Sequence, residues 1–309
     1  MPKRADHQLE QLAQAALAIQ EQEALEAGAI GYYHRVMCQI SMPAKAVHDN
    51  EFEHEVGRIH ISMMAPRRIG IPWGIYPRGI ISFIVSDVVR RKNSGEDTRI
   101  VHLGKSLTEF IGRISGSQLS GGATGNIGRF KKQLLSTCAS RIMWWSGSEE
   151  VAQYRAMEIA PKGNIFWKPN MIEQPGLFAS QIELGEMFHE DILAHAVPVD
   201  TRALKGLWPS CLALDVYTWA TFRAYTMQKA GRRTLDLNWE ALRRQFGPQY
   251  VDLKHFKPRF RQAMTKVKLV YAGFDYEEKG TGVCFKMREP SVRRIFVVNG
   301  RRHLVSTHK

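Results

Sequence analysis

One order of secondary-structure elements is predicted twice along this chain, and this repetition constrains the fold more than any other feature of the sequence. Each copy starts with a long apolar helix, predicted over residues 79–91 and again over residues 212–228. In both places a short strand, a second helix, a turn and a basic amphipathic helix follow. Because tandem copies of one unit repeat their elements in the same order, we predict two related α+β domains.

The strands that follow each basic helix complete the pattern. In the second copy they form a hairpin, predicted over residues 269–276 and 282–287. Helix, strand, helix, helix and hairpin is the layout of a winged helix. The prediction is therefore an α+β fold with two tandem winged-helix domains and an N-terminal amphipathic helix. The predicted divisions are an N-terminal helical arm at residues 1–28, a first winged helix at 29–185, a second winged helix at 186–290 and a basic tail at 291–309.

The charge of the chain indicates a polyanionic partner. It has 43 lysine and arginine residues against 30 aspartate and glutamate residues, a formal net charge of +13. Nucleic acid and an anionic membrane surface are the partners that such a balance suggests. Insertion into a membrane is not expected, since no apolar run approaches the ~20 residues of a spanning helix. The N-terminal residues lack the apolar core of a secretion signal, which predicts a cytoplasmic protein with reduced cysteines.

The sequence lacks the signatures of the common catalytic and cofactor sites. The glycine-rich segment at residues 121–128 has no Lys-Ser/Thr pair of a P-loop and follows no apolar strand, so we interpret it as a flexible turn. His189 and His195 are six residues apart, whereas a zincin helix needs a spacing of four. The four cysteines form no CxxC pair. We therefore expect no cofactor, no metal and no enzymatic activity.

The second basic helix carries the strongest physical signal for DNA binding. Between Arg243 and Lys268 the sequence has eight basic residues and one acidic residue. At ~100° per residue an apolar face separates from a face of arginine, lysine, threonine and glutamine, the combination that a major-groove helix requires. Pro258 either opens this helix or kinks it. The apolar face comprises Phe256, Phe260, Ala263, Met264 and Val267. The candidate DNA-binding residues are Lys254, Lys257, Arg259, Arg261, Gln262, Thr265 and Lys268.

The first basic helix, predicted over residues 126–140, has a weaker version of the same pattern. Its predicted apolar stripe is formed by Ile127, Phe130, Leu134, Leu135 and Cys138. The side chains predicted to point away from this stripe, and thus to contact DNA, are Arg129, Lys132, Gln133 and Ser136. A solvated basic face without a ligand is the alternative interpretation of both helices.

The N-terminal helix, predicted over residues 5–27, has a thin apolar stripe that contains Leu9, Leu12, Ala16 and Ile19. Two interpretations remain open for it. It either packs on its own domain or serves as a contact arm for another protein or a second subunit, which would make the protein a homodimer.

Several motifs, in the same order along the chain, resemble those of the plasmid RepA-type replication initiators between about residues 70 and 292. The first copy contains Ile71-Pro-Trp-Gly-Ile-Tyr-Pro-Arg78, His102-Leu-Gly-Lys-Ser-Leu-Thr-Glu-Phe110 and Gly128-Arg-Phe-Lys-Lys-Gln133. The second copy contains Val197-Pro-Val-Asp-Thr-Arg-Ala-Leu204, Leu212-Ala-Leu-Asp-Val-Tyr-Thr-Trp219 and Trp239-Glu-Ala-Leu-Arg-Arg-Gln-Phe246.

The resemblance implies a bacterial, plasmid- or nucleoid-associated protein that binds repeated double-stranded sequences, called iterons, at its own origin. It implies that the protein helps to open the duplex there, recruits the host initiator and replicative helicase, and takes part in copy control. In initiators of related design the C-terminal winged helix grips the iteron, while the N-terminal one adds DNA contacts or dimerises. Two other classes stay open, a winged-helix transcriptional repressor and a nucleic-acid-processing enzyme such as a nickase or primase.

DNA binding should depend strongly on salt, because each phosphate contact releases counterions. If the two basic faces neutralise about 6 phosphates, the slope of log K against log salt is near −5. Binding titrations at several salt concentrations measure this slope, and a value flatter than about −2 would contradict the electrostatic interpretation.

Overall fold

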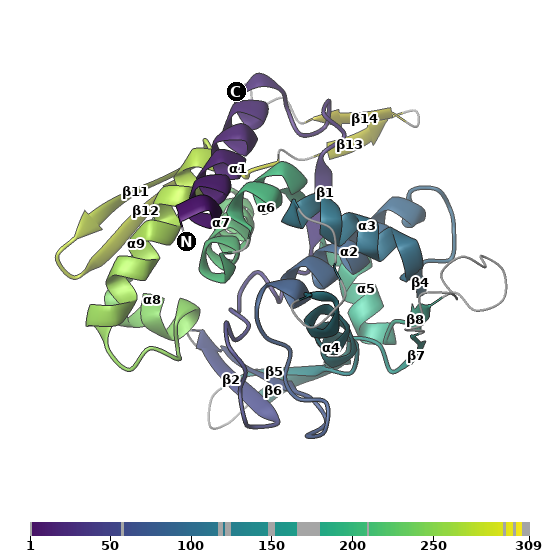
Figure 1. The fold of residues 1–309 in the computed structure, drawn as a ribbon. Coiled ribbons are helices and arrows are strands. Elements are labelled where there is room, and N and C mark those ends of the chain that lie inside the picture. The colour runs from purple at the N-terminus through teal and green to yellow at the C-terminus, as the bar shows by residue number, and fades with distance from the viewer. Residues whose placement is uncertain are drawn as a thin grey trace.

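Helices and short antiparallel strands alternate along the chain, which confirms the predicted α+β class (Figure 1). The computed structural model describes residues 2–304 apart from 57–58, 117–119, 121–124, 148–151, 166–179, 209, 293–294 and 299–300. The N-terminal half contains α1 (Pro2–Glu21), β1 (Ile30–Tyr33), β2 (Glu51–Val56), β3 (Ile59–Met64), α2 (Ile75–Lys92), β4 (Ile100–His102), α3 (Gly104–Ser115), α4 (Ile127–Cys138), β5 (Arg141–Gly147), β6 (Ala152–Glu158), β7 (Lys162–Asn164) and β8 (Gln181–Glu183). The C-terminal half contains α5 (Glu186–His195), β9 (Val197–Asp200), α6 (Thr201–Leu207), α7 (Cys211–Lys229), β10 (Thr234–Asn238), α8 (Trp239–Phe246), α9 (Leu253–Val270), β11 (Phe274–Lys279), β12 (Gly282–Met287), β13 (Ile295–Val298) and β14 (Arg301–Leu304).

The repeated order of elements that the sequence predicts is present in the structure. The series α2, β4, α3, α4, β5 and β6 in the N-terminal half corresponds to α7, β10, α8, α9, β11 and β12 in the C-terminal half. Polar side chains start the helices of the second series, because Ser210, Asn238 and Asp252 each accept a hydrogen bond from the backbone N–H three residues further on. Pro258 lies inside α9 and does not end it, so Lys254 belongs to the first turn of this helix.

The two series differ in how their strands pair. In the C-terminal half an antiparallel sheet has the order β10-β12-β11. In the N-terminal half β5 and β6 join the hairpin of β2 and β3 in a sheet of order β2-β3-β5-β6. The short strand β4 pairs instead with β8, where Val101 lies opposite Ile182 and both side chains are buried. The burial of this apolar pair gives a physical reason for the different partner of β4.

A buried ion pair joins the first helices of the two series. Arg78 on α2 donates from Nε and Nη2 to the two carboxylate oxygens of Asp215 on α7, at 2.7 and 2.6 Å. The guanidinium also donates to the backbone carbonyls of Gly74 and Met42. Arg78 is only 2% exposed, and a charge removed from water to this extent is tolerated only when it is paired and hydrogen-bonded. The ion pair therefore holds α2 and α7 in one relative position.

The N-terminal helix α1 packs across α6 and α9 of the C-terminal half (Figure 1). Leu12 and Ala15 are buried there, and the absence of a side chain at Gly206 allows the close approach, because a Cβ atom at this position would lie 2.7 Å from that of Ala15. The helix thus packs on its own chain with most of the predicted stripe, since Leu12 is buried and Ala16 and Ile19 pack against the core, whereas Leu9 is exposed. A role of this helix as a contact arm for another protein or a second subunit stays a prediction, and Leu9 is exposed.

Removing the carboxylate of the buried pair should strongly destabilise the protein. Asp215→Ala leaves the Arg78 guanidinium buried without its counter-ion, which costs ~3–5 kcal/mol of the free energy of unfolding. Urea unfolding followed by circular dichroism measures this loss. The matched control is Arg90→Ala. Arg90 pairs with Asp87, but its side chain is 66% exposed, so the loss of this ion pair should cost at most about 1 kcal/mol.

Candidate nucleic-acid interface

The apolar face of α9 holds this helix against the rest of the C-terminal half. All five side chains predicted for that face, Phe256, Phe260, Ala263, Met264 and Val267, are buried. The ring of Phe260 contacts the rings of Trp239, Phe246 and Phe256, with centroids 5.1 to 6.3 Å apart. This packing confirms the predicted orientation of α9 and turns its polar side chains outward.

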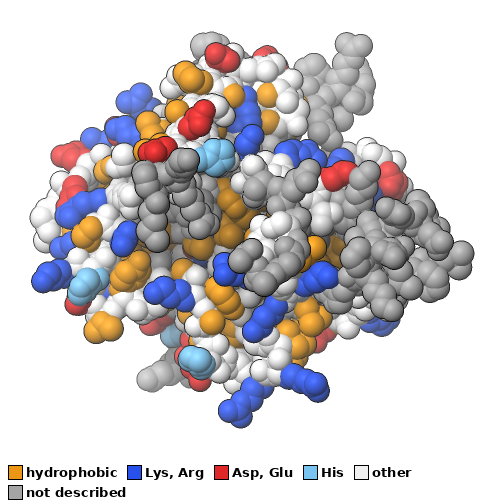
Figure 2. Space-filling model, viewed as in Figure 1, with side chains coloured by type: hydrophobic (Ala, Val, Ile, Leu, Met, Phe, Trp, Pro, Cys, Tyr) orange, Lys and Arg blue, Asp and Glu red, His pale blue; other side chains and the backbone are white. Residues whose placement is uncertain are grey.

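The polar side chains of α9 are at the surface, as the helical periodicity predicts. Lys257 is half-buried, and the other candidates, Lys254, Arg259, Arg261, Gln262, Thr265 and Lys268, are exposed. Figure 2 shows Lys and Arg side chains on the side of the molecule where α9 and the β11–β12 hairpin lie, with Asp and Glu among them. The surface around α9 is therefore of mixed charge, although the helix itself is basic.

Three side chains of α9 are engaged with the neighbouring strand β11. Arg261 donates to both carboxylate oxygens of Glu278, and Lys268 Nζ lies 2.6 Å from Oδ1 of Asp275. Between these ion pairs the hydroxyl of Thr265 is 3.5 Å from that of Tyr276. The hydrogen bonds from Arg261 lower the pKa of Glu278, and the hydrogen bond from Lys268 lowers the pKa of Asp275. Both acids are thus held in their charged form against the helix.

An aromatic ring lies beneath two of the cations of α9. Trp239, the first residue of α8, has Arg261 Cζ at 5.3 Å and Lys257 Nζ at 5.1 Å from its ring centroid. Both distances fall within the range of cation–π attraction. Neither Trp239 nor Glu278 is among the residues that the sequence predicts to contact DNA. The local signal was the acidic stretch Asp275, Glu277 and Glu278 directly after a basic helix, but its pairing with α9 depends on the tertiary structure.

The structure contradicts half of the predicted contact face of α4. Gln133 and Ser136 are buried, whereas periodicity predicts them to be exposed. Gln133 Oε1 accepts a hydrogen bond from the Trp73 backbone N–H at 2.7 Å, and the Ser136 hydroxyl donates to the Gly70 carbonyl. The segment that precedes α2 therefore packs on this side of α4 and removes both side chains from the surface.

The remaining two candidates of α4 are where the sequence predicts them. Arg129 and Lys132 are exposed. Leu135, which was predicted to belong to the apolar stripe, is 42% exposed. The helix is therefore rotated relative to the prediction, because its buried side includes Gln133 and Ser136 in place of Leu135. Only a narrow basic edge of α4 is open to a ligand.

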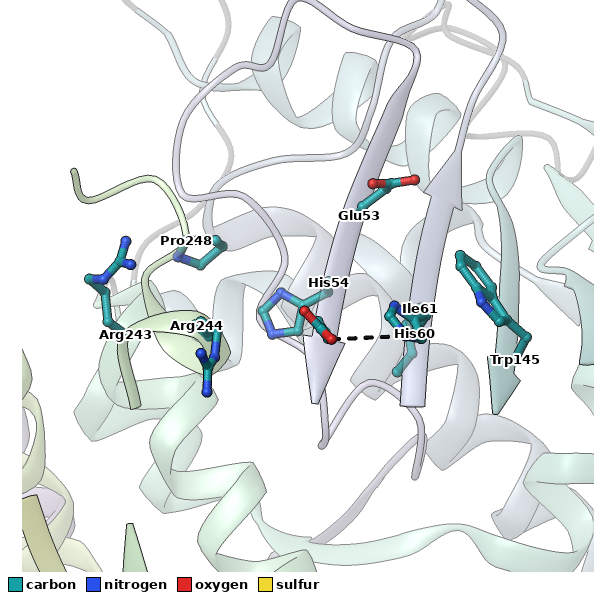
Figure 3. Close-up of a pocket in the computed structure, with 9 residues that line it drawn as sticks. Glu53, His54, His60, Ile61, Trp145, Arg243, Arg244 and Pro248 are labelled. Atoms are coloured by element: carbon teal, nitrogen blue, oxygen red, sulfur yellow. Dashed lines mark ion pairs between the residues drawn. The ribbon is translucent and has the colours of Figure 1, made fainter. Parts of the chain in front are cut away.

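A cleft of about 360 Å³ lies between α8 and the sheet β2-β3-β5-β6 (Figure 3). His60 and Trp145 line it from the sheet with stacked rings whose centroids are 5.3 Å apart. Arg243 and Arg244 line it from α8, and Glu53 and Glu55 also border it. Arginines beside stacked rings suit a planar or phosphate-bearing ligand, but the two glutamates oppose phosphate. The cleft is therefore a weaker candidate for DNA contact than α9.

His54 points from β2 toward α8 in this cleft (Figure 3). His54 is only 4% exposed to solvent. Burial lowers the pKa of His54 to about 4, while the backbone of Gln245 acts in the opposite direction. The imidazole is thus neutral at pH 7, and α8 packs on β2 over an uncharged ring.

The comparisons with known proteins agree with this picture of the fold and identify the family. The family described as "Plasmid encoded RepA protein" matches residues 71–241, a region that includes α2 to α7 and the start of α8. Crystal structures of domains 2 and 3 of RctB have the same overall fold. A selenomethionine form has a TM-score of 0.51 at 13% identity, and a second structure has a TM-score of 0.50 at 12% identity. Each alignment covers 82% of this chain and 96% of the RctB chain.

The fold and the family define the class of this protein, a replication initiator of plasmids. The chain belongs to the plasmid RepA family, as the resemblance of its motifs implies. No curated protein matches the sequence. Within the ranges that the structure describes, no helix is long and apolar enough to cross a membrane, and no group of three or more metal-binding side chains comes together.

Acid should weaken the packing around His54. The unfolded chain takes up a proton at this residue near pH 6.5, whereas the folded protein resists protonation until about pH 4. Stability is therefore lost as the pH falls through this window, by up to ~3 kcal/mol from this group. His54→Gln should remove that part of the loss when urea unfolding is compared at pH 7 and pH 4. His60→Gln, at the more exposed histidine of the same cleft, is the matched control and should leave the acid loss unchanged.

Proposed function

We propose that this protein is an initiator that binds iterons at its own plasmid origin through two winged-helix domains. The observation that carries the proposal is the arrangement of the C-terminal half in a chain of the RepA family. There α7, α8 and α9 pack with the sheet β10-β12-β11, and α9 exposes a basic polar face beside the β11–β12 hairpin. A helix of this kind, supported by a wing, fits the major groove.

We propose that the two halves contact the DNA in different ways. The second winged helix, residues 186–290, reads the repeat with Lys254, Arg259, Arg261 and Gln262, with further contacts from Lys257, Thr265 and Lys268. The first, residues 29–185, adds phosphate contacts through Arg129 and Lys132, which α4 exposes. The arm at residues 1–28 and the tail at residues 291–309 lie outside the two winged helices. We further propose that binding helps to open the origin and recruits the host initiator and helicase, and that it regulates copy number.

Footprinting on the DNA that flanks the gene of this protein tests the proposal directly. We expect several protected repeats of one sequence, arranged in tandem. A single protected palindrome at a promoter would favour a repressor, and the absence of any protected site would reject sequence-specific binding. The proposal includes no strand cleavage, so a covalent protein–DNA adduct on supercoiled origin DNA would also contradict it.

Substitutions on the two basic helices should separate base reading from phosphate binding. Arg261→Ala should relax the preference at one or two base pairs of the repeat, because one guanidinium contact to guanine is worth ~1–3 kcal/mol of discrimination. Lys132→Ala should weaken repeat and random DNA about equally. Fluorescence anisotropy with both duplexes measures the two affinities.

Phe260→Ala is the folding control for this pair. It empties a core site among three aromatic rings and should cost ~3–5 kcal/mol of stability, whereas thermal melts of the other two variants should match that of the wild type. An unchanged ratio of specific to random affinity in Arg261→Ala would show that α9 does not read the DNA with this side chain.

A further inference from the structure

We infer that Glu278 and Trp239 are positioning residues that set the guanidinium of Arg261 for base recognition. This inference rests on the proposed function, since it concerns how α9 reads a repeat. The observations behind it are the contacts of one side chain of α9, Arg261. Glu278 of β11 accepts its hydrogen bonds, and Trp239 of α8 lies within cation–π distance.

The ion pair with Glu278 uses only one edge of the guanidinium. Nε donates to Oε2 at 2.8 Å, and Nη2 donates to Oε1 of the same carboxylate. A guanidinium has five N–H donors in a rigid planar fork, so this pair leaves the two N–H groups of Nη1 and the second N–H of Nη2. The second N–H of Nη2 and one N–H of Nη1 form the adjacent end of the fork, which matches the O6 and N7 acceptors that guanine presents in the major groove. Arg261 can therefore bind Glu278 and a guanine at the same time.

The indole of Trp239 makes a cation–π contact with the same group. Arg261 Cζ is 5.3 Å from the ring centroid, and Trp239 itself is buried against Phe260 and the rest of the core. The side chain of Arg261 is nonetheless 46% exposed. A long flexible arginine is thus held at the surface by a cation–π contact and a two-point ion pair. Ordering it before DNA arrives reduces the conformational entropy that binding would otherwise cost.

The charge of Glu278 has two effects on DNA binding. A carboxylate at the DNA-facing surface repels phosphates wherever the protein binds, whereas its support of Arg261 helps only when a guanine lies opposite. Specificity is a difference between two affinities, so the general repulsion cancels and only the support of Arg261 increases the specificity. A carboxylate that merely masked Arg261 would act in the opposite way on the repeat, because its removal would release the arginine and tighten binding.

The experiment compares the wild type with Glu278→Gln, which keeps the shape of the side chain and removes its charge. The probes are a duplex that carries one footprinted repeat, the same duplex with each base pair changed in turn, and a shuffled duplex. We expect the ratio of repeat to shuffled affinity to fall about tenfold, which corresponds to the lower part of the range for one base contact. The lost discrimination should fall at the same base pair as in Arg261→Ala, and affinity for the shuffled duplex should not decrease.

The neighbouring acid provides a matched control. Glu277 is one residue away on β11, and its carboxylate pairs with Lys286 of β12 instead of a side chain of α9. Glu277→Gln makes the same change in charge, so it should leave the base-pair preference unchanged. Arg261→Lys keeps the positive charge and should lose the preference at the same base pair. An ammonium group lacks the planar fork that would bind the Glu278 carboxylate and a guanine at the same time. The double variant Arg261→Ala with Glu278→Gln should be no less selective than Arg261→Ala alone.

The outcomes separate this inference from the proposed function. If the wild type shows no preference for the repeat, the proposed function fails and the inference fails with it. If the wild type discriminates and Glu278→Gln keeps the same ratio, or binds the repeat more tightly, only the positioning role of Glu278 is rejected. Thermal melts of every variant establish that the fold is intact, and Arg261→Lys tests the need for the planar fork without removing Glu278.

Discussion

The buried pair of Arg78 and Asp215 is the interaction on which the arrangement of the two halves depends. Its members lie on α2 and α7, the first helices of the two repeated series, and its other hydrogen bonds reach the backbone at Met42 and Gly74. The guanidinium thereby connects three segments of the chain, namely α2 with its N-cap Gly74, α7, and the segment at Met42. Since neither charge has access to bulk water, any movement of α2 against α7 would separate a buried charge from its partner. The positions of α4 and α9, which follow these helices in the two series, are set relative to the same pair.

The C-terminal half uses charge in a different way, at the surface. The basic helix α9 has its side toward β11 occupied by acids of that strand, so part of its charge is balanced within the protein. Lys254, Arg259, Arg261 and Lys268 are all exposed. Arg261 and Lys268 are in addition paired with Glu278 and Asp275. On the proposed function, DNA binding by α9 would involve an exchange or a sharing of partners and not simple neutralisation of free cations. The net charge of +13 therefore indicates attraction to a polyanion but not which cations are free to make contacts.

The N-terminal half differs from the C-terminal half in the pairing of its strands. Its β5–β6 hairpin is extended by β2 and β3, and its short strand β4 pairs with β8 instead. The added hairpin carries His54 against α8, so the extension of this sheet also forms a contact between the halves. Together with α1, which crosses α6 and α9, it makes the two series parts of one continuous hydrophobic core. Element order alone thus describes the repetition of units but not the additions that join them.

Features that depend on short-range periodicity could be predicted from the sequence alone. The bounds of α7, within one residue at each end, and the buried face around Phe260 follow from residues three or four positions apart, which lie together on any helix. The motifs also identified the RepA family. Only the tertiary structure decided what lies opposite each helix. Gln133 and Ser136 are buried because the segment at residues 70–74 packs on them, and Arg261 is held by a glutamate 17 residues away along the chain. Both outcomes depend on contacts between segments distant in sequence, which helical periodicity does not encode.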